Sequence, residues 1–121
     1  MAFLGVIEAY ESAKDRLNGM TLAEFEDHAK DFEVIPMYAD GKVCGALMIH
    51  ENHIHACILS WAEGKWFSRK AARVLNRVIE QFGEAITSAT TEKGCAFVLA
   101  LGFTKDGEIY RSSKKWELRQ S

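Results

Sequence analysis

The segment from Ser68 to Gly83 constrains the fold of this chain more than any other. Its apolar residues recur three and four positions apart, as on the buried face of an amphipathic helix: Ala71, Ala72, Val74, Leu75, Val78, Ile79 and Phe82. Ser68 is a favourable N-cap and Gly83 a favourable stop. Strand-like runs flank the helix at 53–61 and 84–90. Since a helix between two strands of one sheet normally makes them parallel, we expect these two to be parallel neighbours.

Two shorter helices are predicted before this one. Residues 3–17 carry apolar residues at helical spacing, and Asn18-Gly19 ends that pattern. Thr21 with Glu24 forms a capping box that opens a second helix, which runs to about Lys30.

The pattern then changes to that of strands. Asp40-Gly41 is a strong signal for a two-residue hairpin, and Glu51-Asn52 is a second turn. Pro36 marks an edge strand or a bulge. The turns separate three strands of an antiparallel meander, at 32–39, 43–50 and 53–61.

The end of the chain continues the alternation of helices and strands. A short apolar helix is predicted over 92–101, before Gly102. Strands at 103–105 and 108–116 flank Asp106-Gly107 as a last hairpin. We therefore expect an α/β (α+β) fold with two N-terminal helices, a meander, and a parallel strand after the central helix. No linker divides the chain, so residues 1–121 are expected to form one domain.

This order of elements resembles the fold of the GNAT acetyltransferase superfamily. The segment 91–103, TEKGCAFVLALGF, is similar to the family pattern Asn-x-x-Ala-x-x-x-Tyr-x-x-Leu-Gly-Phe, and its Leu-Gly-Phe ending is kept. The resemblance covers roughly residues 32–116 and implies a mixed sheet whose two parallel strands splay apart. It also implies an acyl-coenzyme A ligand, with acetyl-CoA as the possible cofactor.

The resemblance places the coenzyme A pyrophosphate at the loop before the central helix. The residues at the matching positions are Lys65, Trp66, Ser68, Arg69 and Lys70. The family's loop has glycines, which let backbone N–H groups approach the pyrophosphate. Here the glycine positions hold Trp66 and Ser68, so we expect acetyl-CoA to bind weakly or not at all.

The family's catalytic position is also changed. Val98 occupies the place of the general-acid tyrosine, and Thr91 that of the asparagine. No residue is therefore assigned a catalytic role, and enzyme activity is left open. Degenerate domains of this type resemble internal virion or head-assembly proteins of short-tailed phages. That likeness implies a protein that acts through protein partners in particle assembly; the alternative is an active CoA-dependent N-acyltransferase with an atypical cofactor loop.

Charge is unevenly distributed along the chain. Residues 1–60 hold 4 basic and 10 acidic side chains, whereas residues 61–121 hold 11 and 7. The basic half could face an anionic ligand, or the two halves could simply attract each other. Arg69, Arg73 and Arg77 form a basic stripe with Lys70 beside it. Because the chain is acidic overall, a solvated helix face is favoured over nucleic-acid binding.

Two clusters of side chains have competing interpretations. His50, His53 and His55 could bind zinc or supply a general base, but a hairpin end is where polar residues belong, and surface histidines without a metal are favoured. The aromatic residues near the central helix favour core packing, although an exposed tryptophan there would indicate a protein interface; they are Trp61, Trp66, Phe67 and Trp116.

Cysteine usage and hydropathy indicate the compartment. Cys44, Cys57 and Cys95 are odd in number and lie in apolar runs, which is typical of reduced thiols. The N-terminus is a poor signal peptide, and no stretch approaches the length of a membrane span. We expect no membrane association and a cytoplasmic location, meaning the host cytoplasm or the virion if a phage encodes the chain. The oligomeric state is left open.

Overall fold

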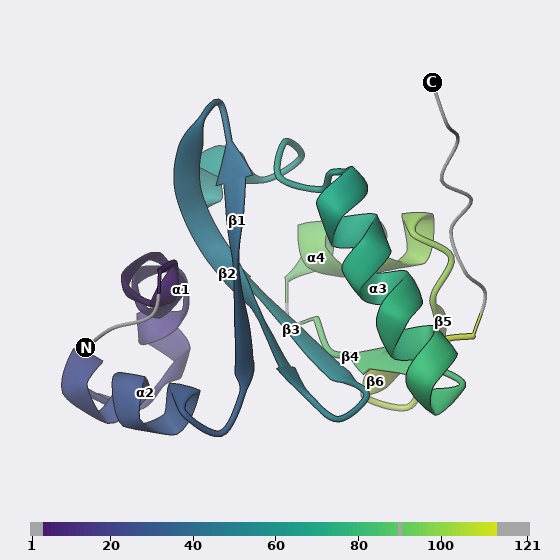
Figure 1. Cartoon of the computed structure of the whole chain (residues 1–121), viewed down its shortest axis with the longest axis horizontal. Coiled ribbons are helices and arrows are strands. Elements are labelled where there is room, and N and C mark those ends of the chain that lie inside the picture. Colours follow the sequence, from purple (N-terminus) through teal and green to yellow (C-terminus); the bar gives the residue numbers. More distant parts are fainter. Residues whose placement is uncertain (1–3, 90, 114–121) are drawn as a thin grey trace. The chain divides into compact units, whose positions relative to one another are not determined.

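The computed structural model describes residues 4–89 and 91–113 (Figure 1). Over these residues the helices are α1 (Val6–Ala13), α2 (Leu22–Ala29), α3 (Arg69–Phe82) and α4 (Glu92–Ala100). The strands are β1 (Glu33–Ala39), β2 (Lys42–His50), β3 (His53–Ile58), β4 (Ala85–Thr87), β5 (Thr104–Asp106) and β6 (Ile109–Ser112). They form a mixed sheet in the order β1-β2-β3-β4-β6-β5. The predicted mixed α+β class is confirmed.

The predicted parallel neighbours are present. β3 and β4 pair in parallel through His53 and Ile86, and the Ile86 N–H donates to the Asn52 carbonyl at 2.8 Å. The Thr87 hydroxyl donates to the Ile54 carbonyl at 2.7 Å, so a side chain occupies the acceptor that the next β4 amide would use in a longer ladder. The pairing covers this single register pair. The splay of the two strands stays a prediction.

Contacts divide the chain into two compact units. Unit 1 comprises residues 1–50 and 55–68, and unit 2 comprises residues 51–54 and 69–121. The expectation of one domain over residues 1–121 stays a prediction. Among the described residues, the helices are all too short or too polar to cross a membrane.

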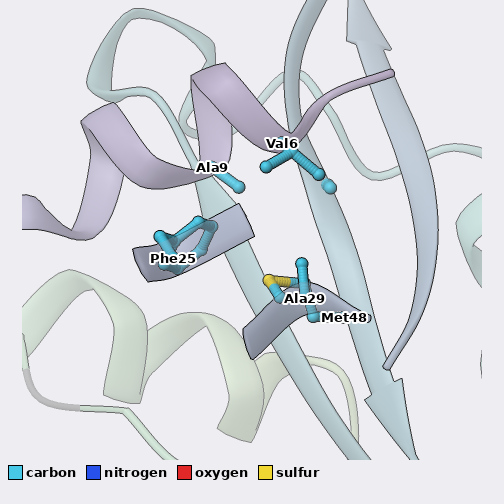
Figure 2. Close-up of a cluster of buried hydrophobic side chains, with 6 residues drawn as sticks. Val6, Ala9, Phe25, Ala29 and Met48 are labelled. Atoms are coloured by element: carbon cyan, nitrogen blue, oxygen red, sulfur yellow. The ribbon is translucent and has the colours of Figure 1, made fainter. Parts of the chain in front are cut away.

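The core of unit 1 lies between the two N-terminal helices and the sheet. Figure 2 shows side chains of α1 and α2 pointing toward Met48 of β2. The cluster comprises Val6, Ala9, Phe25, Ala29, Ala46 and Met48. The predicted capping box is confirmed, since the Thr21 hydroxyl accepts from the Glu24 N–H at 3.2 Å and Glu24 Oε1 accepts from the Thr21 N–H at 3.0 Å. The cap fixes the residue at which α2 begins. Phe25 and Ala29, four residues apart on one face of this helix, are buried.

Two glycines let backbone segments of unit 1 meet closely. A Cβ at Gly45 would overlap the carbonyl oxygen of Cys57 on β3, and one at Gly5 would lie 2.7 Å from the carbonyl oxygen of Gly45. Gly5 also has φ +93°, a left-handed conformation that cannot be part of a helix. This corrects the predicted helix 3–17: α1 begins at Val6 and ends at Ala13, before a 3₁₀ turn at Lys14–Arg16.

A bulge lies near Pro36, as the proline suggested. The register of β1 against β2 shifts between Met37 and Tyr38, which leaves Cys44 as the extra residue on β2. The bulge is tied on both sides, because the Cys44 thiol lies 3.4 Å from the Met37 carbonyl oxygen and the Cys44 carbonyl accepts from the Leu59 N–H at 2.8 Å. β1 is also an edge strand in the sheet that the described strands form, with β5 at the opposite edge.

The two predicted hairpins differ in outcome. Asp40 and Gly41 have φ +52° and +76°, as a type I′ turn requires, and the first hairpin is confirmed. In the last hairpin, Asp106 pairs with Ile109, so the loop is Gly107-Glu108 rather than Asp106-Gly107. Gly107 has φ +65° at the first loop position, where a type II′ turn needs glycine.

α3, which belongs to unit 2, carries the predicted buried stripe. Ala71, Ala72, Val74, Leu75, Val78 and Ile79 are buried. Phe82 is the exception: it is 43% exposed at the last position of the helix, so its predicted burial is wrong. Gly83 has φ +87° and its N–H donates to the Ile79 carbonyl at 2.7 Å, which confirms the predicted stop.

Three strands are shorter than predicted. β3 ends at Ile58, because the chain leaves the sheet after Leu59 and forms a 3₁₀ turn at Ser60–Ala62. β4 is limited to Ala85–Thr87, in keeping with the Thr87 side-chain bond that replaces the next ladder bond. β6 ends at Ser112, and the rest of the predicted strand from 114 to 116, with Trp116, lies outside the described residues.

Candidate functional site

The candidate cofactor loop is the stretch between β3 and α3. Lys65, Trp66 and Ser68 belong to unit 1, whereas Arg69 and Lys70 are the first two residues of α3 and belong to unit 2. Ser68 directly precedes α3, where an N-cap residue would stand. Its hydroxyl cap stays a prediction.

The loop is closed by its own hydrogen bonds. The Ala62 N–H donates to Leu59, the Glu63 N–H to Ser60 and the Lys65 N–H to Ala62, at 3.0, 3.2 and 2.9 Å. A pyrophosphate cradle needs several N–H groups that point together at the ligand. In this loop the amides of residues 62, 63 and 65 already have backbone acceptors.

Lys65 pairs with the first hairpin. Its Nζ lies 3.1 Å from Asp40 Oδ2, and both side chains are more than half exposed. An exposed pair contributes about 0–1 kcal/mol, so it does not lock the ammonium in place. It does give Lys65 a protein anion as its partner and links the loop to the tip of the β1–β2 hairpin.

Trp66 is a core residue of unit 1. Only 7% of it is exposed, and its ring packs edge-on against Phe67 with 5.6 Å between ring centroids. Five residues earlier, Trp61 is 42% exposed on the 3₁₀ turn. Of the two interpretations of the aromatic cluster, Trp66 supports core packing, and Trp61 has the exposure typical of an interface tryptophan.

The positions that match the family's catalytic motif have structural roles. Val98 is buried on α4, at 9% exposure. The Thr91 hydroxyl caps α4 by accepting from the Gly94 N–H at 3.0 Å. One turn from Val98, Cys95 lies close to Tyr110 of β6, and this hydrogen-bonding contact, with burial, raises the pKa of the Tyr110 hydroxyl. The contact and the burial both favour the neutral phenol over the phenolate.

Two of the three histidines contact the same aromatic ring. His50 and His55 each contact Phe32 edge-on, with 5.9 Å between ring centroids. His53 is exposed on β3. Within residues 4–89 and 91–113, no group of three His, Cys, Asp or Glu side chains is arranged to hold a metal ion.

Sequence patterns missed one polar cluster in unit 2. Arg111 of β6 donates to Glu84 Oε2 at 2.5 Å and to Asp106 Oδ2 at 2.7 Å. These two carboxylates raise the pKa of the guanidinium, the hydrogen bond to Asp106 contributing most. No local spacing signals a cluster whose members lie five and 27 residues from Arg111.

Comparisons with protein-family models, curated proteins and solved structures found no match to this chain.

Proposed function

We propose that this protein acts through contacts with other proteins rather than through acyl transfer. The observation that carries this proposal is the candidate cofactor loop. Its turn is closed by internal hydrogen bonds, and Trp66, at a position where the family has glycine, is buried. Three backbone amides that precede α3, those of residues 62, 63 and 65, already have acceptors, and a bulky side chain stands where glycine would let the backbone approach a pyrophosphate.

The second support is the exposed Trp61. Exposed tryptophans are frequent among the residues that dominate protein interfaces, because they bury a large area with little loss of conformational freedom. The resemblance to degenerate phage proteins suggests the setting, which is assembly of the head or of internal virion components. The corresponding location is the host cytoplasm during assembly and then the particle.

An active CoA-dependent N-acyltransferase is the second candidate. Arg69 and Lys70 favour it, since both are exposed in the first turn of α3, where an anion would also be attracted by the helix dipole. Against it stands Val98, whose side chain has no proton to give to a leaving thiolate.

Calorimetric titration with acetyl-CoA separates the two candidates. A dissociation constant of about 1 μM corresponds to a binding free energy of about −8 kcal/mol. We expect acetyl-CoA to bind more weakly than this or not at all. The matched controls are the double variant Arg69→Ala/Lys70→Ala and, on β5, Lys105→Ala. Micromolar binding that the double variant loses and Lys105→Ala keeps would establish the cofactor site and overturn the proposal.

The assembly role has its own test. If a phage encodes this chain, mass spectrometry of purified particles should detect it in the head or among internal proteins. Trp61→Ala should remove it from the particles while leaving the purified protein folded. Particles that form normally and never contain the wild-type protein would contradict this setting.

A further inference from the structure

The outer face of α3 carries a basic stripe. Arg69, Arg73 and Arg77 follow one another at every fourth residue, and all three are exposed. Lys70 lies beside them, and the first turn of α3 contains no acidic residue. Cations near the N-terminus of a helix oppose its dipole. At 1.5 Å per residue, the stripe is about 12 Å long.

A stripe of opposite charge runs along α2. Glu24, Asp27 and Asp31 are exposed and lie three and four residues apart, which is the spacing of one helix face. α2 ends at Ala29, and Asp31 continues the stripe in the turn that follows, where its N–H donates to the His28 carbonyl at 3.1 Å. Glu24 caps the helix and Asp27 pairs with exposed Lys30 at 3.3 Å, so both acids stay at the surface.

The two stripes belong to units of opposite charge. Unit 1 holds 5 basic and 10 acidic side chains, a net charge of −5, and unit 2 holds 10 and 7, a net charge of +3. Charge segregated in this way creates fields that orient two approaching molecules. A surface that carries exposed carboxylates at helical spacing is complementary in charge to the α3 stripe, and the chain itself carries such a surface.

We propose that the basic stripe of α3 in one copy docks against the acidic stripe of α2 in a second copy. Arginine suits this contact, because its guanidinium can pair with a carboxylate through two parallel hydrogen bonds. A nucleic acid is the less favoured occupant, since unit 1 and the net charge of −2 repel a polyanion.

The contact joins unlike surfaces, so a bound pair still presents one free stripe of each sign, the α2 stripe of one copy and the α3 stripe of the other. Such heterologous contacts build chains or rings rather than closed dimers. The inference rests on the proposed function, because it names a second copy of the chain as one of the protein partners. Two exposed stripes bury far less than the roughly 1,200 Å² of a stable interface, so the association should be weak and concentration-dependent.

Sedimentation velocity of the wild-type protein over a range of concentrations provides the first test. We expect the sedimentation coefficient to rise with concentration in about 0.1 M salt and the rise to disappear in about 1 M salt, where the Debye length falls from about 10 to about 3 Å. A coefficient independent of concentration at both salt levels would overturn the proposal.

A charge swap provides the second test. Arg73→Glu/Arg77→Glu makes α3 repel α2 of another copy, and Asp27→Lys/Asp31→Lys does the same from the other side. Each variant alone should remain monomeric. An equimolar mixture should associate again, because the reversed α3 of the first variant fits the reversed α2 of the second.

Other outcomes of these experiments are distinguishable. A mixture that stays monomeric while the wild type associates would overturn the pairing of α3 with α2. A DNA oligonucleotide that binds the wild type more tightly than a second copy, and loses binding in Arg73→Glu/Arg77→Glu, would replace the proposal by nucleic-acid binding. Neither result depends on the acetyl-CoA titration, so the proposed function stands or falls separately.

Discussion

Unit 1 and unit 2 hold their strands together by different means. In unit 1, β1 and β2 pair over seven register positions, and glycines let α1, β2 and β3 approach backbone to backbone. In unit 2, β6 pairs with β4 and with β5 over only three register positions each, and the side chains of Thr87 and Arg111 add hydrogen bonds to this short ladder. A single added methyl group should therefore harm unit 1 most, whereas unit 2 should be more sensitive to the loss of polar side chains.

The largest expected effect is that of Gly45→Ala. The new Cβ would overlap the Cys57 carbonyl oxygen, so β2 and β3 must separate. We expect a loss on the order of 4 kcal/mol or more in the free energy of unfolding, measured by urea denaturation. The control is Gly64→Ala, which has φ +82° but no atom within 4 Å of the added carbon. It should cost only the left-handed strain, about 1 kcal/mol. Equal losses in the two variants would show that the close approach of β2 to β3 at Gly45 does not contribute to the stability of unit 1.

Trp66→Ala should follow, with a loss of about 3–5 kcal/mol, because it empties a buried site beside Phe67. The matched variant Trp61→Ala should change the free energy of unfolding by about 0.5 kcal/mol or less, since that side chain is 42% exposed. Thermal and urea unfolding of both variants measure the difference. Similar losses in the two variants would show that Trp66 does not contribute more to stability than Trp61 and would contradict its assignment as a core residue.

Cys57 makes unit 1 sensitive to alkali. Burial raises the pKa of its thiol from 9.0 to about 11, with Arg16 opposing the shift. The thiol ionises near pH 9 in the unfolded chain and near pH 11 in the folded one. The free energy of unfolding is therefore unaffected by this thiol below pH 9 and falls as the pH rises from 9 toward 11. The full loss is about 2–3 kcal/mol, at 1.36 kcal/mol per pH unit.

The measurement is urea unfolding of reduced protein at about pH 7.5 and about pH 10.5, on either side of the ordinary thiol pKa of 9.0. Cys57→Ala is the control, because lysines and tyrosines titrate over the same range. The wild type should lose more stability than the variant. An identical loss in both would mean that the thiol is not the group responsible.

Arg111→Gln tests the polar linkage of unit 2. It removes the charge that joins Glu84 at the start of β4 to Asp106 of β5. We expect faster amide hydrogen exchange in β4, β5 and β6 with little change in β1 and β2. Lys105→Gln, a neighbouring exposed change on β5, serves as control. Exchange that accelerates equally in both units would contradict the division.

The smallest expected effect is that of the histidines. Replacing His50, His53 and His55 together by Gln should shift the free energy of unfolding by about 0.5 kcal/mol, as surface changes usually do. A chelator should leave the melting temperature unchanged. Unfolding on chelation would show that these side chains hold a metal.

Local signals predicted most of the elements, and contacts between distant residues account for the differences. The Thr21 capping box, the Asp40-Gly41 turn and the Gly83 stop each depend on a few adjacent residues, and all three are confirmed. The start of α1 depends on Gly5 meeting Gly45, forty positions away, and no periodicity records that meeting.

The candidate site was predictable in composition but not in arrangement. Residues 62–68 have neither helical nor strand periodicity, so the sequence could not say that Trp66 is buried. Trp61 ends the run predicted as a strand, but β3 ends at Ile58 and leaves Trp61 exposed on the 3₁₀ turn. Phe82 is a residue for which periodicity gave a wrong prediction. Its position on the apolar stripe of α3 predicted burial, but it is the last residue of the helix and is 43% exposed. Periodicity does not show how far along a helix its packing partners extend.

The two edges of the sheet have a consequence for behaviour in a crowded cell. Pro36 lacks an N–H group in the middle of edge strand β1, and edge strand β5 is three exposed residues long with Lys105 and Asp106. Both features hinder the addition of a foreign strand, which is how native sheets nucleate amyloid-like stacking. A chain protected in this way is less prone to strand-by-strand aggregation at high concentration.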